Sequence, residues 1–321
     1  MTGSVRMLTE PVAHHGEGPI WDDRLDRLVW VDMLAGRVLL TDLTGRTTAV
    51  EVPDPVAAFV RPIAGAADHL VVGERTLWRV DLTAGADPDR TGPVGTGTVG
   101  TGTGTVGAGH PERVGELPLA DGVRSNDGGC APDGTLFVGT MAYDTAPGRG
   151  DVFVLRADGR IEVALAGTTV SNGQQFLDDR RVLFVDSPTG LLREYRRGAD
   201  DRWTAPREVA ACAPGSPDGM CVDADGGVWV ALFDGAMVRR WSRDGELTDE
   251  IALPVRRPTS VALGGPDRRT LFVTTSALGR EPGGDPAAGA LFVVDVEVPG
   301  VPVHPWRPVS VVPSGARRRD G

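Results

Sequence analysis

The feature that most constrains the fold is a short apolar motif that recurs six times along the 321 residues. Each copy alternates apolar residues in the pattern LxV or LFV, which is typical of a buried β-strand. The six copies read "RLVWVD", "HLVVGE", "TLFVGT", "VLFVDS", "GVWVAL" and "TLFVTT". Between their central residues, from Val29 to Phe272, the spacings are 42, 66, 47, 45 and 43 residues. One period over the whole length indicates a fold built by repeating one unit.

The 66-residue interval is longer than the others because it contains a low-complexity segment. Residues 92–109 read "GPVGTGTVGTGTGTVGAG". A segment of this composition offers too little apolar surface to order itself. We therefore interpret it as an insert in an otherwise regular repeat.

Each unit has the same internal order of short strands. A first strand and an Asp/Gly-rich turn precede the LFV strand, and a third strand such as "GRVLLTD" or "DVFVLR" follows it. A fourth strand fits weakly between units, as in "TTAVEV" and "EIALPV". Repeats of roughly 40 to 50 residues with several strands and no helical periodicity are typical of propeller blades. We predict an all-β, six-bladed β-propeller over residues 1–321, with a sandwich or pair of sandwiches as the alternative.

Composition limits the partners that such a chain could have. Apolar residues make up 40% and charged residues 24%, as in ordinary globular proteins. The net charge of −11 argues against a protein that neutralises nucleic-acid phosphates. The three cysteines form no CxxC pair, and neither an apolar signal-peptide core nor a run of about 18 apolar residues is present. We expect a cytoplasmic protein with reduced thiols and no membrane partner.

Polar residues gather at one position of the repeat. In a propeller the first strands line the central channel, so their starting residues form a ring around one channel mouth. Four of the six predicted first strands begin with oxygen-bearing side chains, namely Glu17, Asn126 with Asp127, Asn172, and Asp218. These residues are far apart in sequence and are expected to be close together in the folded ring.

Two carboxylates and two amide oxygens around one cavity predict a site for a single divalent metal ion. Buried like charges either raise a pKa or recruit a cation. Oxygen ligands suit Ca²⁺, Mg²⁺ or Mn²⁺, and an open carboxylate site can also hold Zn²⁺. Each residue alone also has a simpler interpretation, because Asp218 could open a turn and Asn tolerates left-handed conformations. The shared position in the repeat favours the site.

Other catalytic motifs are weak or missing in the sequence. His14 and His15 are adjacent, and neighbours in an extended chain point to opposite sides, so we interpret them as structural or rim residues. The sequence contains no G-x-S-x-G elbow, no phosphate loop before a helix and no H-E-x-x-H.

Four segments resemble one known family. They are "EGPIWD", "RSNDGG" with the following "GTLFVGTM", "SNG", and "PDGMCVDADGGVWVA". Together they resemble the senescence marker protein, gluconolactonase and luciferin-regenerating enzyme family, which includes regucalcin, over essentially the whole chain. The resemblance implies a six-bladed propeller with one divalent metal at the channel mouth, and hydrolysis of sugar lactones.

The resemblance also implies roles for individual residues. Glu17, Asn172 and Asp218 would be metal ligands, with Asn126 near the metal. Arg124 and Asn126 would contact the substrate, and Asp144 matches an acidic residue after "GTM" that binds sugar in the family. Asp218 would double as the general base. The sequence departs from the family after "SNG", where Gln174 and Gln175 replace apolar and aromatic residues.

Three functions remain open at this stage. The first is metal-dependent hydrolysis, in which Asp218 accepts the proton of the attacking water and Arg124 holds hydroxyls or the developing carboxylate. The second is a calcium-binding regulatory protein without turnover, which has no need of Arg124 or Asp144. The third is a non-hydrolytic biosynthetic enzyme with the same metal site and a pocket that includes the two glutamines.

Overall fold

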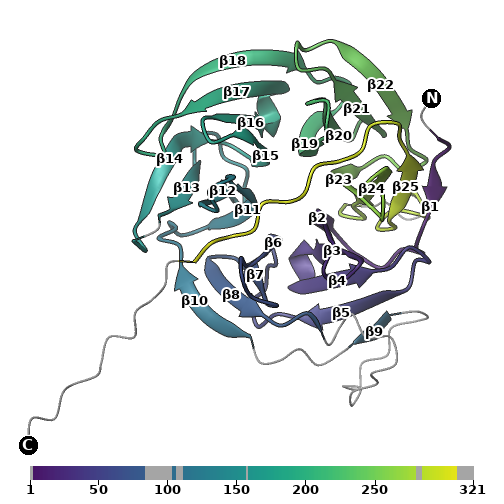
Figure 1. Cartoon of the computed structure of the whole chain (residues 1–321), viewed down its shortest axis with the longest axis horizontal. Coiled ribbons are helices and arrows are strands. Elements are labelled where there is room, and N and C mark those ends of the chain that lie inside the picture. The colour runs from purple at the N-terminus through teal and green to yellow at the C-terminus, as the bar shows by residue number, and fades with distance from the viewer. Residues whose placement is uncertain (1–2, 84–102, 106–110, 157, 280–283, 309–321) are drawn as a thin grey trace, which may run out of the picture.

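The computed structural model describes residues 3–83, 103–105, 111–156, 158–279 and 284–308. Its strands form six sheets arranged like blades around one central axis (Figure 1). The prediction of a six-bladed β-propeller is confirmed. The figure shows blade 1 in dark purple and the later blades in teal and green.

The blades follow one another along the chain, each beginning with the strand nearest the axis. The strands of blades 1 to 3 are β2 (Gly16–Asp22), β3 (Arg27–Asp32), β4 (Arg37–Thr41), β5 (Thr47–Glu51); β6 (Phe59–Pro62), β7 (His69–Val72), β8 (Thr76–Val80), β10 (Glu112–Glu116); β11 (Val123–Cys130), β12 (Leu136–Ala142), β13 (Gly150–Leu155), β14 (Ile161–Thr168). The strands of blades 4 to 6 are β15 (Ser171–Asp178), β16 (Arg181–Asp186), β17 (Leu191–Arg197), β18 (Trp203–Ala211); β19 (Ser216–Val222), β20 (Val228–Phe233), β21 (Met237–Trp241), β22 (Leu247–Ala252); β23 (Pro258–Gly264), β24 (Thr270–Thr275), β25 (Phe292–Asp295), β1 (Arg6–Met7). Two 3-10 turns, η1 (Met33–Ala35) and η2 (Ser187–Thr189), follow β3 and β16.

The six copies of the apolar motif are the second strands of the blades. All six of their central residues are at most 2% exposed. These side chains pack into clusters between neighbouring blades, where Trp21 of blade 1 stacks on Phe272 of blade 6. The motif therefore repeats because every blade must bury both faces of its second strand against its neighbours.

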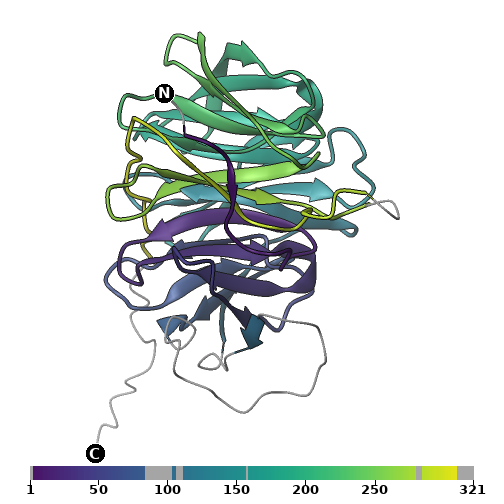
Figure 2. The ribbon, with the colours of Figure 1, turned by 90° about the vertical axis from the view of Figure 1, so that its right-hand side faces the viewer.

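The N-terminus closes the ring of blades. β1 pairs antiparallel with β25, which places the first described strand of the chain as the outermost strand of the last blade. Figure 2 shows this purple segment against the side of the disc. Blade 6 thus combines residues from both ends of the chain.

The C-terminal segment crosses one face of the disc, at the end of the central channel. In Figure 1 it runs in yellow from β25 over the centre to the opposite blades. Backbone hydrogen bonds fix it at both ends, from Ala224 N to Pro299 O and from Trp306 N to Pro62 O, each 2.8 Å long. We call residues 299–307 the strap. It closes the end of the channel opposite the starts of the first strands.

Of the predicted insert at 92–109, only residues 103–105 lie within the described part of the chain. They form β9 (Thr103–Thr105), which pairs parallel with β5 at the outer edge of blade 1. No described helix is long and apolar enough to cross a membrane. Cys130, Cys212 and Cys221 are free thiols, and burial raises the pKa of Cys130 and Cys212 to about 12.

Candidate active site

The predicted ring residues lie where the first strands bulge. Pairing with the second strand shifts register in five of the six first strands, and the shift falls at the ring position each time. A bulge adds a residue that has no partner in the ladder, and it turns the local side chains. The unpaired residues are Gly18 and Pro19, Asn126 and Asp127, Gly173, Asp218 and Gly219, and Thr259. This local distortion is what directs polar side chains into the channel mouth.

The carboxylates of Glu17 and Asp218 are buried in this mouth, each residue being 6% exposed. Burial, and next the nearby Asp127, raise the pKa of Glu17 to about 8. Burial, followed by the charges of Glu17 and Asp127, also raises the pKa of Asp218 well above its ordinary value. The Oδ1 atom of Asp218 has no hydrogen-bond partner among the described residues. Without a bound cation, both carboxyl groups therefore hold their protons more firmly than free carboxyl groups do.

The two asparagines are fixed by a chain of hydrogen bonds across blades 3, 4 and 5. Asn126 Nδ2 donates to Asn172 Oδ1 at 2.7 Å, and Asn172 Nδ2 donates to Ser187 Oγ at 2.8 Å. Ser187 in turn donates to Pro217 O at 2.6 Å, one residue before Asp218. An amide oxygen has two acceptor sites, so Asn172 Oδ1 retains one for a further ligand.

Arg124 is a buried cation beside these residues. Its Nη1 donates to Asn126 Oδ1 at 2.8 Å and to Ser125 O at 2.9 Å. The guanidinium lies over the ring of Tyr143, with its central carbon 5.7 Å from the ring centroid. The structure thus brings Glu17, Asn126, Asn172, Asp218 and Arg124 together at the mouth, and their roles stay predictions.

Asp144 is placed differently from the other predicted site residues. It is exposed on the loop after β12, where its Oδ2 lies 3.7 Å from Arg149 Nη1 and its Oδ1 accepts from Ala146 N at 3.1 Å. The contact with Arg124 is made by its neighbour Tyr143. The sugar-binding role of Asp144 stays a prediction.

His15 borders the carboxylate pair without joining it. Its Nε2 is 3.9 Å from Glu17 Oε1, and its Nδ1 is 2.8 Å from Ser276 Oγ. Burial, followed by the charge of Arg124, lowers the pKa of His15 to about 4. The imidazole is therefore neutral near pH 7, and it adds no positive charge to the mouth.

Two contributing residues carry no clear signal in the sequence, and a third, Asp127, is a predicted ring residue without a predicted role. The charge of Asp127 raises the pKa of both Glu17 and Asp218. Ser187 reaches the site from η2 of blade 4 and positions Asn172. Arg61 at the start of blade 2 is buried below the mouth, where its side chain donates to Val60 O and Gly128 O.

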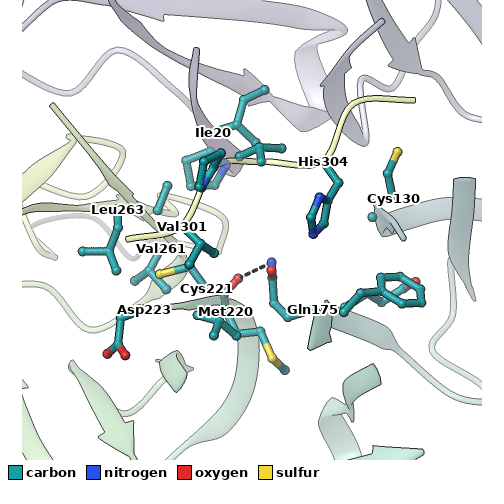
Figure 3. A pocket seen from close by; sticks show the side chains of 18 of the residues that line it. Ile20, Cys130, Gln175, Met220, Cys221, Asp223, Val261, Leu263, Val301 and His304 are labelled. Atoms are coloured by element: carbon teal, nitrogen blue, oxygen red, sulfur yellow. Dashed lines mark hydrogen bonds between the residues drawn. The ribbon is translucent and has the colours of Figure 1, made fainter. Parts of the chain in front are cut away.

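Below the mouth, the channel widens into a cavity of about 430 Å³. Figure 3 shows His304 of the strap and Gln175 at this cavity, with Val301 across from them. The two glutamines that depart from the family pattern both donate hydrogen bonds to backbone oxygens. Gln174 Nε2 donates to Asp127 O at 3.3 Å, and Gln175 Nε2 donates to Met220 O at 2.9 Å. The glutamines therefore line the channel beneath the mouth.

The donor set of the mouth fits a hard divalent cation. The described residues contain no group of three or more His, Cys, Asp and Glu side chains that could hold a metal ion. The available donors are instead two carboxylates and amide oxygens, which Ca²⁺ and Mg²⁺ accept. The unpartnered Asp218 Oδ1 and the raised pKa of Glu17 are what a cation would relieve, because an opposite charge favours the ionised carboxylate.

Known proteins share this architecture and much of the sequence. The 6-deoxy-6-sulfogluconolactonase of Pseudomonas putida is 34% identical over 295 residues, which cover 89% of this chain and 92% of that protein. The pentonolactonase of Haloferax volcanii is 34% identical over 300 residues, with the same shares covered. A solved structure of a luciferin-regenerating enzyme has a TM-score of 0.80 at 25% identity and covers 95% of this chain and 99% of its own.

The family model described as "SMP-30/Gluconolactonase/LRE-like region" matches residues 15–277, a span that begins two residues before Glu17 and ends just after β24 of blade 6. This span contains every predicted site residue. The chain belongs to the SMP-30/gluconolactonase/LRE-like family.

Proposed function

We propose that this protein is a metal-dependent hydrolase that opens sugar lactones. The observation that carries the proposal is the convergence of Glu17, Asn172 and Asp218, with the free Asp218 Oδ1, beside the buried cation Arg124. Relatives named as lactonases, which this chain matches over most of their length, support the same activity.

The metal would be held by Glu17, Asn172 and Asp218, with Asn126 adjacent. When bound, a divalent cation supplies Lewis acidity to the lactone carbonyl and makes water a better nucleophile. The donor oxygens do not decide between Ca²⁺, Mg²⁺, Mn²⁺ and Zn²⁺.

The residues of the chain then divide the acid–base and binding work. Asp218 accepts a proton as the water oxygen bonds to the carbonyl carbon, and it returns that proton to the ring oxygen as the ring C–O bond breaks. Arg124 presents its planar fork to the hydroxyls of the sugar or to the developing carboxylate. Asn126 holds Arg124 through Oδ1, and Asp144 would contact the sugar from the rim. The product is the open-chain hydroxy acid.

The test is a panel of lactones with acid release as the readout, using metal-loaded protein. We expect turnover by the wild type, a loss of at least about 100-fold in kcat for Asp218→Asn, and a loss expressed mainly in KM for Arg124→Ala. Glu208→Gln serves as the control, because Glu208 is an exposed carboxylate on β18 of the outer rim.

The outcomes separate lactone hydrolysis from metal binding without turnover. Metal-dependent thermal stabilisation without turnover on any lactone would favour a binding protein. Metal-dependent stabilisation with unchanged lactone opening in both variants would exclude the hydrolytic mechanism proposed here. Chelation should abolish turnover and readdition of the metal should restore it.

A further inference from the structure

A half-exposed aromatic residue covers the guanidinium of Arg124 at the channel mouth. Tyr143 is 50% exposed, and Arg124 lies over its ring. The hydroxyl of Tyr143 donates to Glu74 Oε1 at 2.5 Å. Arg124 and Tyr143 belong to blade 3, whereas Glu74 follows β7 of blade 2. Side chains from two blades thus meet at the same guanidinium.

The backbone around Tyr143 and Glu74 is tied to the beginning of β11. Tyr143 N donates to Gly122 O at 2.9 Å, and Ser125 N donates to Glu74 O at 2.8 Å. Glu74 N itself donates to Asp54 Oδ1 at 2.8 Å. Gly122 and Ser125 lie two residues before and one residue after Arg124. The backbones of Tyr143 and Glu74 are therefore fixed relative to Arg124.

The contacts leave one edge of the guanidinium available. Among the described residues, all three hydrogen bonds of the Arg124 side chain leave from Nη1, to Met33 Sδ, Ser125 O and Asn126 Oδ1. The ring of Tyr143 covers one face, and the Glu74 carboxylate adds an opposite charge behind the ring. A free arginine side chain has several rotamers, and ordering it costs free energy whenever a ligand binds. Here that ordering is already done in the folded protein.

We propose that Tyr143 and Glu74 are positioning residues for Arg124, and that they make this site select lactones by their hydroxyl groups. The proposal rests on the lactonase function proposed above. The hydroxyl groups of a polyhydroxylated lactone accept hydrogen bonds from the preordered guanidinium of Arg124. A lactone without hydroxyl groups cannot make these hydrogen bonds before its ring opens.

The experiment compares two substrates, D-glucono-δ-lactone and δ-valerolactone, in metal-loaded Tyr143→Leu, Tyr143→Phe and Glu74→Ala. For Tyr143→Leu we expect KM for the hydroxylated lactone to rise about tenfold, the scale of a partly desolvated cation–π contact, with kcat within about twofold. Both parameters for δ-valerolactone should stay within about twofold. Tyr143→Phe should restore most of the loss because the ring remains, and Glu74→Ala should fall between the two.

Two control variants account for changes in exposed residues as such. Leu247→Ala removes a side chain that is also 50% exposed, on the outer strand β22. Glu250→Gln removes a carboxylate of β22, the outermost strand of blade 5, that pairs with Arg239 of β21. Neither should change KM for either substrate. An equal loss on both substrates in Tyr143→Leu, or no rise in KM, would overturn the proposal.

A second measurement does not depend on turnover. The Nε–H NMR signal of Arg124, assigned by its disappearance in Arg124→Lys, should carry a ring-current shift from Tyr143. The shift should be lost in Tyr143→Leu and kept in Tyr143→Phe. If the wild type opens no lactone, the lactonase function fails while this signal still tests the positioning. If the signal is unchanged in Tyr143→Leu, the positioning role is wrong whatever the activity.

Discussion

At the scale of single residues, the mouth of the channel concentrates groups whose pKa values are displaced by burial. The pKa values of Glu17 and Asp218 are raised, and the pKa of His15 is lowered. An acid whose pKa is raised in the folded state holds its proton more firmly there, so its contribution to stability falls as the pH rises. A histidine whose pKa is lowered has the opposite effect. The two effects overlap only below the ordinary pKa of His, near 6.5.

This difference predicts the pH dependence of the metal-free protein. Between pH 4.5 and 6.5 the contributions of Glu17 and His15 oppose each other. Between pH 6.5 and 8 the carboxyl groups act without the histidine, and the free energy of unfolding should fall as the pH rises, by roughly 2 kcal/mol from Glu17 alone. Urea unfolding in the presence of a chelator measures it. Glu17→Gln should flatten the slope, and a saturating divalent metal should remove it; a flat or rising curve in the metal-free wild type contradicts the prediction.

At the scale of elements, the bulged first strands decide where the site lies, and they need close contact with their neighbours. Gly219 in the bulge of β19 lies against Ser260 of β23, and a Cβ at residue 219 would be 2.8 Å from Ser260 Cα. Since that atom belongs to the backbone, the two strands would have to separate. Glycine here permits the approach of blades 5 and 6 beside Asp218.

Gly219→Ala should therefore lower the free energy of unfolding by about 1–3 kcal/mol, the usual cost of overpacking, and weaken metal binding in the same variant. Denaturant unfolding and calorimetric titration with Ca²⁺ measure the two effects. Gly198→Ala is the matched control: like Gly219 it has no positive φ, and a Cβ there would come within 3 Å only of Asp200 Oδ1, the end of an exposed side chain. Equal stability losses in the two variants would show that the contact with Ser260 has no special cost.

The elements also show how far the sequence could predict the fold and the site. The second strands and the polar starts of the first strands could be predicted, because alternating apolar residues mark a buried strand and the repeat places one polar position at the channel mouth. The bulges in the first strands were not predicted. The contact of Tyr143 with Arg124 was not readable, since it depends on the path of the loop after β12. The position of Asp144, which lies near Arg149 on the same loop, likewise depends on that path, and its sugar-binding role stays a prediction.

At the scale of the whole molecule, two terminal segments connect the blades. β1 completes blade 6 from the N-terminal side, and the strap connects blades 5 and 6 to blades 2 and 3 across the channel. Trp306 of the strap is 8% exposed and packs into the core shared by the first blades. We predict that the chain behaves as one domain, because every blade depends on its neighbours for burial.

Trp306→Ala should then lower the free energy of unfolding by about 3–5 kcal/mol, with a single cooperative transition retained. Lactone opening at 25 °C should persist, because the strap lies at the end of the channel opposite Asp218. Circular dichroism and intrinsic fluorescence followed through the same urea titration test both points. Transitions that do not coincide, or a stability equal to the wild type, would contradict the role given to the strap.

The sequence by itself determined the number of blades, the second strands and the positions of the ring residues. These features follow from local rules, namely burial of alternating side chains and the backbone requirements of bulges and turns. Only the tertiary structure decided which strand completes blade 6, that the strap closes the channel, and that Tyr143, Glu74 and Ser187 hold the site residues. These contacts join segments from different blades or from opposite ends of the chain. They form only once the blades are arranged around the axis, so a local sequence pattern does not predict them.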